Sequence, residues 1–370
     1  MKGTTVKIVE QIEVPTGHIL LLEGHKGMLE TVVMGDYGKD INLGSGAVVD
    51  GTPLIPLTDK WVFSISTQYG CSMGCQFCDV PKVGPGANAT LHDMQQQVLL
   101  GLKTHSEITY SNRLNIHYAR MGEPTWNPAV LDHARWMKEH IDPEYNVHPV
   151  LTTMMPAKNE WLKVMLHAWM RMKNRVYHGN AGLQLSINST DEEERHRIFS
   201  GNALALSDIS AMCDGMVPIG RKITLNFPVC QWTVDPRILR RYFDPERFLV
   251  KLTPMHVTDA SLKFGHETSG DYTTLEPYEP LAQAIRDEGF DVLIFIASRE
   301  EDHGFITCGN AALAVRNGRA KKEIQLRTGE LNFIGGASVG ITPFAKWSEQ
   351  PDRYHTATTE KNVLMPVLEQ

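Results

Sequence analysis

Three of the six cysteines in this 370-residue chain, Cys71, Cys75 and Cys78, lie within eight residues of one another. Their spacing, Cys-x3-Cys-x2-Cys, puts three thiolates on one short loop that also contains Gly74. Three thiolates with no fourth cysteine nearby can hold three irons of a [4Fe–4S] cluster and leave the fourth iron open. An open iron can bind a substrate or cofactor, whereas a closed cluster can only pass electrons. The spacing therefore predicts an iron–sulfur centre with a chemical task.

A zinc site is the alternative interpretation of these cysteines. Zinc sites usually combine a Cys-x2-Cys pair with a second pair of ligands at similar spacing. His92 and His105 follow the cysteines, but neither belongs to such a pair. The pattern therefore favours iron–sulfur chemistry over zinc.

Composition and charge limit the class of protein. A hydrophobic content of 42% and a charged content of 21% are those of a globular protein with a sizeable core. No apolar run approaches the roughly 18–20 residues that span a membrane, and the N-terminus has no apolar signal core. We expect no membrane association, and we expect a cytoplasmic location because an iron–sulfur centre requires a reducing compartment.

The formal net charge of −7 bears on partners. Proteins that bind a long polyanion usually carry a basic surface, because phosphate neutralisation supplies much of the affinity. A basic patch in this chain must therefore be local, at 171–175, 237–241 or 316–322, and each of these is more often a solvated helix face.

Short β-rich runs alternate with helical patterns from residue 60 onward. The predicted strands are 61–66, 114–119, 148–153, 182–188, 222–229, 248–254 and 290–297, and helical stretches separate them. This rhythm predicts parallel βαβ units and a partial (β/α)6 barrel of the α/β class. The cysteine loop follows the first barrel strand, at the face where barrel enzymes carry out their chemistry.

The segments outside the barrel have other patterns. Residues 1–58 predict a small β meander followed by a Gly- and Pro-rich arm, residues 59–298 the barrel, and residues 299–370 a C-terminal extension that carries Cys308. A terminal strand or hairpin is expected within 321–340, and the polar tail from 348 is expected to be mobile.

The cysteine loop, with Phe77 directly before the last cysteine, resembles the signature of the radical S-adenosylmethionine (SAM) superfamily. In that superfamily the open iron chelates SAM, and one electron cleaves SAM into methionine and a 5′-deoxyadenosyl radical. Further segments resemble one branch, the RNA adenine carbon-methylating radical SAM enzymes, over about residues 15–320. These segments are 29–34, 121–127, 185–188, 250–256 and 299–309.

The resemblance implies a role for each matching residue. Cys71, Cys75 and Cys78 would ligate the cluster. Cys308 would be methylated on sulfur by one SAM, after which a second SAM would yield the radical that abstracts hydrogen from this methyl group. Glu30 would lie near the substrate base. The expected SAM-binding residues are Phe77, Gly122, Glu123, Pro124, Thr153, Ser186 and His256.

Several of these residues also have ordinary structural interpretations. A single cysteine such as Cys308 is often a small buried hydrophobic residue, and a hairpin glutamate such as Glu30 is usually a solvated charge. Glu123 could simply cap the helix that follows it. His256 is most often a loop histidine with a satisfied hydrogen bond.

Two departures from the branch bear on the reaction. Ser64 occupies the position of the cysteine that breaks the enzyme–substrate crosslink, and a hydroxyl cannot do so because only a thiolate attacks sulfur in this way. Cys213 and Cys230 both read as core thiols, although Cys230 closes a strand at the active face and is the nearby thiol that could replace the missing cysteine. The N-terminal RNA-binding domain of the branch is also expected to be missing, because the meander starts near residue 5.

The leading hypothesis is a radical SAM enzyme that transfers a methyl or related one-carbon group through Cys308 to an adenine-like or other nucleobase. The alternative is a relative that uses the 5′-deoxyadenosyl radical directly on a small molecule or peptide. Both need a [4Fe–4S] cluster, SAM and a flavodoxin-like or ferredoxin-like electron donor, and the first suggests a nucleic acid or nucleotide-like substrate.

Overall fold

The computed structural model describes residues 6–14, 16–35, 55–268, 275–295 and 311–313. The strands of its main sheet are β1 (Lys7–Val14), β2 (Gly17–Gly24), β3 (Gly27–Met34), β4 (Trp61–Ile65), β7 (Leu114–Tyr118), β8 (Val147–Thr153), β9 (Gly182–Ser186), β10 (Ile223–Val229), β11 (Phe248–Pro254) and β12 (Asp291–Ile294). Within the described residues these ten strands form one sheet in chain order.

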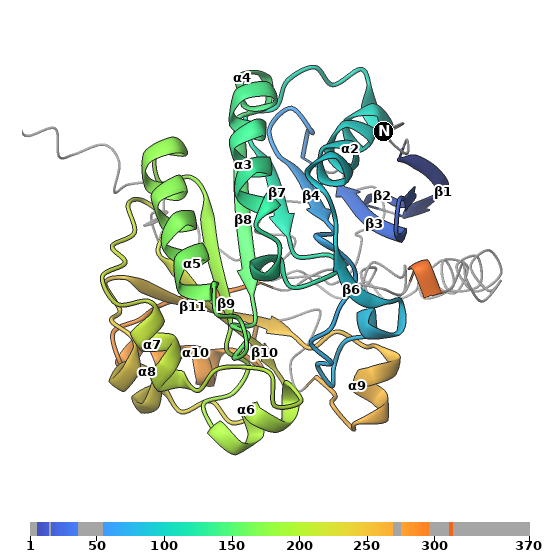
Figure 1. Cartoon of the computed structure of the whole chain (residues 1–370). Helices are drawn as coiled ribbons and strands as arrows, with labels where there is room; N and C mark the ends of the chain where they lie inside the picture. The colour runs from blue at the N-terminus through green and yellow to red at the C-terminus, as the bar shows by residue number, and fades with distance from the viewer. Residues whose placement is uncertain (1–5, 15, 36–54, 269–274, 296–310, 314–370) are drawn as a thin grey trace, which may run out of the picture.

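In this main sheet, every pairing from β4 to β12 is parallel, and helices connect these strands (Figure 1). The helices are α2 (Leu91–Leu102), α3 (Ala129–His140), α4 (Asp142–Tyr145), α5 (Leu162–Arg171), α6 (Glu192–Ile198), α7 (Leu206–Met212), α8 (Pro236–Tyr242), α9 (Asp259–Lys263) and α10 (Glu279–Asp287). The α/β class and the partial (β/α)6 barrel predicted from the strand rhythm are confirmed.

The local sequence explains where these helices begin and end. The Thr90 side chain and the Asp93 side chain cap each other's backbone N–H groups at the start of α2. The Asp191 side chain accepts a hydrogen bond from the Glu194 amide at the start of α6. After α10, Gly289 has φ +91°, a conformation that glycine adopts without strain and that turns the chain into β12.

The predicted meander is present and extends the barrel sheet. Strands β1, β2 and β3 are antiparallel, and β3 pairs with β4, the first barrel strand. The boundary at residue 58 stays a prediction, because the arm at 36–54 lies outside the described residues. Most of the C-terminal extension, including Cys308 and the hairpin expected within 321–340, also lies outside them.

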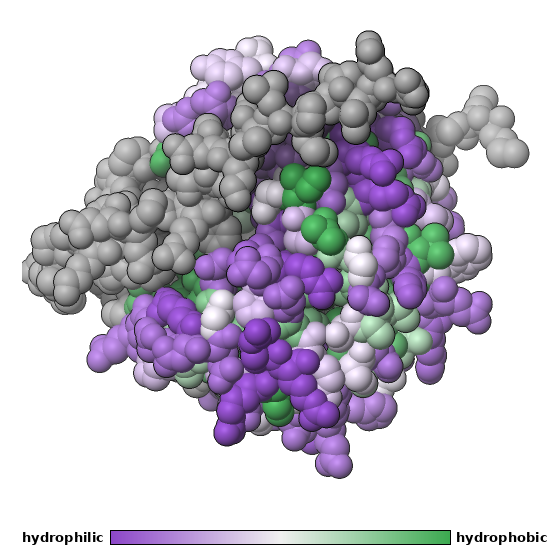
Figure 2. All heavy atoms as spheres, turned by 90° about the vertical axis from the view of Figure 1, so that its left-hand side faces the viewer, coloured by the Kyte–Doolittle hydropathy of each residue, from purple (hydrophilic) through white to green (hydrophobic). Residues whose placement is uncertain are grey.

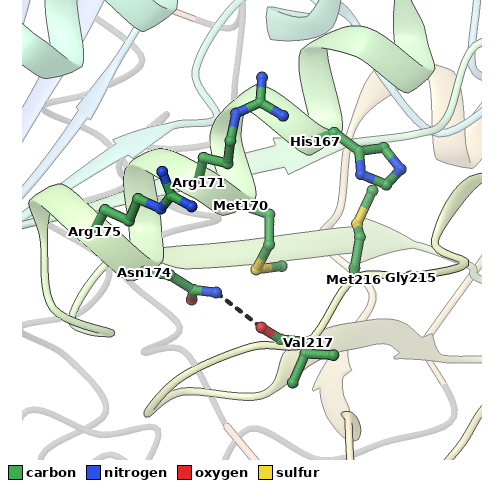
Figure 3. A pocket seen from close by; sticks show the side chains of 8 residues that line it. All are labelled: His167, Met170, Arg171, Asn174, Arg175, Gly215, Met216 and Val217. Carbon is green, nitrogen blue, oxygen red and sulfur yellow. Dashed lines mark hydrogen bonds between the residues drawn. The ribbon is translucent and has the colours of Figure 1, made fainter. Parts of the chain in front are cut away.

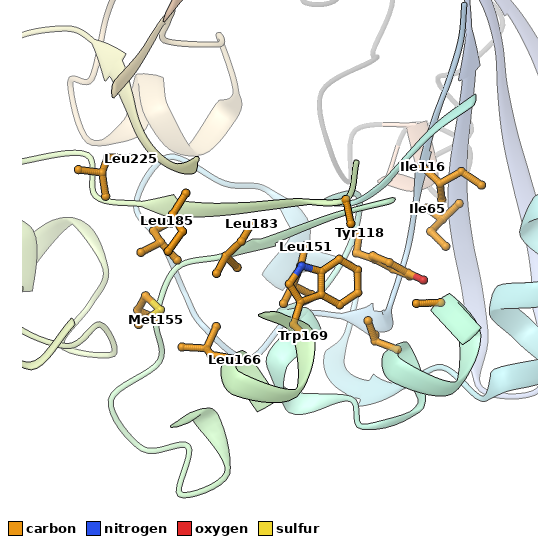
Figure 4. Close-up of a cluster of buried hydrophobic side chains, with 14 of the residues drawn as sticks. Ile65, Ile116, Tyr118, Leu151, Met155, Leu166, Trp169, Leu183, Leu185 and Leu225 are labelled. Carbon is orange, nitrogen blue, oxygen red and sulfur yellow. The ribbon is translucent and has the colours of Figure 1, made fainter. Parts of the chain in front are cut away.

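The barrel strands present two different faces. One face packs Leu151, Leu183 and Leu225 against helix residues such as Trp169, whose indole N–H donates to the Gly182 carbonyl (Figure 4). The opposite face, called here the polar face, carries half-buried polar side chains on β4, β7, β9, β10 and β11. They are Ser64, His117, Gln184, Asn226 and Lys251. A strand alternates its side chains between faces, so one buried apolar face leaves the other free to line a site.

The outer surface on the left of Figure 1, over α5, α7 and α8, is shown in Figure 2. Hydrophilic side chains predominate there, and hydrophobic side chains stand among them. In the described part of the chain no helix combines the length and apolar character needed to cross a membrane.

Candidate functional site

A short hairpin that the sequence did not predict brackets the cysteine loop. Strand β5 (Gln68–Gly70) leads into Cys71 and pairs with β6 (Pro85–Asn88) on the far side of the loop. Gly70 has φ +81°, and a Cβ there would lie 2.0 Å from the Gly84 carbonyl oxygen. The loop can therefore fold back on itself only because glycine stands at its entrance.

The three predicted cluster cysteines are half-buried on this loop. Cys71 and Cys75 pack against an apolar cluster that includes Met73, Phe199 and Cys230. The Cys78 amide donates to the Cys75 carbonyl at 3.2 Å. Burial raises the pKa of the Cys75 thiol, and the charges of Cys71 and Glu123 raise it further. Several thiolates close together in an apolar pocket need a cationic partner, which iron provides.

The donor set is three cysteines, all half-buried on one loop. Three thiolates on one loop can each bind a different iron of a [4Fe–4S] cluster, so the residues present fit such a cluster. Among the described residues, no group of three His, Cys, Asp or Glu side chains is arranged to hold a single metal ion.

Phe77 lies in an aromatic group next to this loop. Its ring meets Phe199 and Trp232 edge to face, with centroids 5.8 and 5.5 Å apart. The Trp232 indole N–H donates to His266, and His266 also lies 3.3 Å from the Gln76 side chain. These contacts hold the loop against the ends of β10 and β11.

Asp79, which directly follows Cys78, is a buried anchor that sequence reasoning missed. Its carboxylate accepts from the Asp259 and Ala260 amides at the start of α9, at 2.9 and 3.0 Å, and from Lys82 at 2.5 Å. The Thr258 hydroxyl donates to the Phe77 carbonyl nearby. The cysteine loop is thus tied to the segment after β11, and an acidic residue beside the last cysteine was the available signal.

The segment Gly122–Pro124 forms a tight turn after β7. Gly122 has φ +96°, and a Cβ there would lie 2.5 Å from the Gln68 side chain. The Glu123 carboxylate is buried and accepts from the Thr125 amide, the Thr125 hydroxyl and the Met154 amide. Burial raises the pKa of Glu123, and these hydrogen bonds oppose the rise. Glu123 therefore does cap the short helix that follows, and it also ties β7 to the end of β8.

The remaining predicted SAM residues lie at the carboxyl ends of other strands. Thr153 ends β8 and its hydroxyl accepts from the Met155 amide at 3.0 Å. Ser186 ends β9, and its carbonyl accepts from Arg195. His256 follows β11 and is half-buried. The structure brings the ends of these strands to the edge of the sheet that carries the cysteine loop (Figure 1). Their contacts with SAM stay a prediction.

Glu30 is not the solvated hairpin charge that its strand context suggests. Its side chain is fully buried and forms an ion pair with buried Arg120, with Nε and Oε2 2.9 Å apart. Glu30 Oε1 accepts from the Ala312 amide at 2.7 Å. Sequence reasoning missed Arg120, although it stands two residues before Gly122.

The two other cysteines in the described residues are buried, as expected for core thiols. Cys213 ends α7 in the main core, and Cys230 directly follows β10 in the apolar cluster beside the cysteine loop. Cys230 is 9% exposed. Ser64 lies within β4 on the polar face, opposite Val32 of β3.

A separate pocket of about 210 Å³ lies at the C-terminal end of α5 (Figure 3). Its lining includes His167, Arg171, Arg175 and Val217, and the Asn174 amide donates to the Val217 carbonyl. Helices in βα units run back along the sheet, so this pocket lies at the edge opposite the cysteine loop. None of the predicted site residues within the described chain lines it.

Comparisons with known proteins find relatives in sequence and in fold. No family model matches the chain. A probable dual-specificity RNA methyltransferase RlmN from Deinococcus deserti is 26% identical over 265 residues, 70% of this chain and 72% of that protein. RlmN from Campylobacter lari is 38% identical over 68 residues, which span 18% of this chain and 19% of that protein.

A solved structure has the same fold. A radical SAM methyltransferase from Sphaerobacter thermophilus aligns with a TM-score of 0.60 and 20% identity, over 83% of this chain and 81% of that one. The chain is therefore similar in sequence to RlmN methyltransferases over up to 70% of its length, and it shares its fold with a radical SAM methyltransferase.

Proposed function

We propose that this chain is a radical SAM methyltransferase that transfers a one-carbon group through Cys308 to a heteroaromatic ring of a nucleobase. The chain spans about a fifth of the length of the Campylobacter lari RlmN, so the activity of the whole protein is part of the proposal. An RNA substrate is part of the proposal because those relatives are RNA methyltransferases by name.

The observation that carries the proposal is the position of Ala311 and Ala312. Both are buried against Val32 and other residues of β1–β3, on the polar face of the sheet. Cys308 precedes Ala311 by three residues. The buried position of Ala311 and Ala312 therefore supports the proposal, because only three residues of chain, at most about 11 Å when extended, link Ala311 to Cys308.

A [4Fe–4S] cluster on Cys71, Cys75 and Cys78, with SAM bound, would supply a 5′-deoxyadenosyl radical after one-electron reduction by a flavodoxin-like or ferredoxin-like donor. The chain's own residues supply the rest. The hairpin β5–β6 and Asp79 hold the cysteine loop. Glu123 and Thr153 order the strand ends where SAM is expected, and Phe77 packs against Trp232 beside the cysteine loop.

Cys308 acts as the carrier. Its thiolate would take the methyl group of one SAM and leave S-adenosylhomocysteine. The 5′-deoxyadenosyl radical from a second SAM would take a hydrogen atom from this methyl group and become 5′-deoxyadenosine, and the methylene carbon, still bonded to sulfur, would bond to the ring carbon. The adduct would then lose the ring hydrogen as a proton, and attack of a second thiolate on the Cys308 sulfur would break the sulfur–carbon bond, which leaves a disulfide, returns one electron and releases the ring with a methyl group after it takes up a proton. Such a ring carbon is too weakly nucleophilic for ordinary polar methyl transfer, which is why a radical route suits it. The polar face, with Gln184 and Asn226, offers hydrogen-bonding groups to a base.

Mass spectrometry of the Cys308 peptide tests the proposal. Protein from cells fed deuterated methionine should carry a labelled methyl group on Cys308. The variant Cys308→Ser should lose this mass but still release 5′-deoxyadenosine from SAM under reducing conditions. An unmodified Cys308, both as isolated and after incubation with SAM, contradicts the proposal and favours direct use of the 5′-deoxyadenosyl radical.

A further inference from the structure

A buried ion pair joins three parts of the chain that lie far apart in the sequence. Glu30 is on β3, Arg120 follows β7, and Ala312 belongs to the short helical segment 311–313. The side chains of Glu30 and Arg120 are 0% and 2% exposed. One carboxylate oxygen of Glu30 meets Arg120 and the other accepts the Ala312 amide.

The backbone of Glu30 is held in place on both sides. The Glu30 amide donates to the Ser66 hydroxyl at 3.2 Å, and the same hydroxyl donates to the Glu30 carbonyl at 2.6 Å. Gln97 of α2 in turn bonds both the amide and the carbonyl of Ser66. Glu30 therefore presents its carboxylate from a rigid position, as a residue that orients another segment must.

Arg120 extends this network toward the expected SAM site. Its amide donates to the Ile65 carbonyl at 3.2 Å, and the carbonyl of the next residue, Met121, accepts from the Thr67 and Gln68 amides. The turn Gly122–Pro124 follows directly. Arg120 is thus joined through the chain to the turn Gly122–Pro124. Glu30 holds the segment that follows Cys308, through the Ala312 amide.

Stability alone does not account for such a pair. Desolvation of two charges offsets much of their attraction, and an apolar replacement of similar volume is often as stable. What a buried pair with defined partners does provide is a fixed geometry between the segments that it joins. The burial of Glu30 also argues against direct contact with a substrate base. Both of its carboxylate oxygens already have partners within the protein.

We propose that Glu30 is a positioning residue, which with Arg120 holds the segment after Cys308 against the strands that lead to the Gly122–Pro124 turn. The consequence for catalysis rests on the proposed function. If the pair fixes how Cys308 faces SAM, then breaking it impairs the loading of Cys308 more than the reductive cleavage of SAM.

Glu30→Gln is the informative variant, because it keeps the size and the acceptor oxygen but removes the charge that faces Arg120. Hydrogen exchange followed by mass spectrometry should show exchange at least about tenfold faster in the peptide that contains Ala311 and Ala312. Methyl occupancy of Cys308 should fall by about tenfold, while 5′-deoxyadenosine release stays within about twofold of the parent protein. Glu23→Gln is the matched control, because Glu23 lies on neighbouring β2 in an exposed ion pair with Lys7.

Arg120→Lys provides a second test if Glu30→Gln folds poorly. Lysine keeps the charge but loses the planar guanidinium group, so both effects should be smaller than in Glu30→Gln. Unchanged exchange at Ala311 and Ala312 in well-folded Glu30→Gln or Arg120→Lys protein overturns the proposal. Faster exchange with no methyl group on Cys308 in the parent protein supports the anchor and instead refutes the proposed function.

Discussion

Ser64 lies directly opposite Val32 in the antiparallel pairing of β3 and β4, and Val32 belongs to the same buried apolar cluster as Ala311 and Ala312. Position 64 and the segment after Cys308 therefore lie on the same face of the sheet. The sequence resemblance placed a crosslink-resolving thiol at position 64, and the register of these strands provides a spatial reason for that position.

Ser64→Cys tests this relationship. If an enzyme–substrate adduct forms through Cys308, a thiol at position 64 should lower the trapped adduct or raise product turnover, because a thiolate can attack sulfur and a hydroxyl cannot. Adduct can be measured by gel shift and product by mass spectrometry, with Ser64→Ala as the control. Cys230→Ala should leave the adduct unchanged, because Cys230 is buried and follows β10, several strands from β4. A rise in adduct in Cys230→Ala would assign resolution to Cys230.

Cys75→Ala should abolish the iron centre. Anaerobically purified parent protein should hold about four irons and four sulfides. The variant should lose them and release no 5′-deoxyadenosine from SAM, because a missing thiolate opens the cluster. Cys213→Ala is the control: it removes a thiol buried in the core and should cost about 1 kcal/mol of stability while keeping the iron. A colourless parent protein that contains zinc would contradict the iron–sulfur assignment.

Asp79→Ala should destabilise the protein and the cysteine loop together. It leaves two amides at the start of α9 without their acceptor, and it leaves Lys82 without its buried partner. We expect a loss of about 2–3 kcal/mol in the free energy of unfolding. Denaturant unfolding measures this loss, and iron retention during anaerobic dialysis reports on the loop. Asp259→Ala, at an exposed position in the same contact, should have little effect, and an equal loss in both variants would argue against the anchor.

Lys173 predicts a dependence of stability on alkaline pH. Burial lowers the pKa of Lys173 to about 7, and its ammonium group donates to the Ile219 carbonyl. Above pH 7 the folded state has released this proton while the unfolded state keeps it up to about pH 10.4, so the unfolded state binds more protons across that window. The contribution of Lys173 to the free energy of unfolding therefore rises with pH from about 7 to about 10, by at most about 1.4 kcal/mol per pH unit.

The free energies of unfolding of the parent protein and of Lys173→Met, measured at pH 7 and at pH 9.5, give the pH-dependent contribution of Lys173. The variant should show a flatter profile, because methionine has no proton to release. Lys138→Met, at a half-exposed position in an ion pair with Asp142, is the control. Parallel profiles for parent and Lys173→Met would contradict a neutral Lys173 at high pH.

The sequence by itself determined the cysteine loop and the strand–helix rhythm, because each of these depends on local spacing. Hydrophobic periodicity and capping residues such as Asp191 suffice to define such elements. Tertiary structure alone decided the surroundings of Glu30, Asp79 and Arg120. Glu30 looks exposed in its hairpin, yet its buried environment comes from Arg120, 90 residues later, and from Ala312, 282 residues later. A charge is buried only when a partner from elsewhere in the chain compensates its loss of solvation, and local sequence contains no record of that partner.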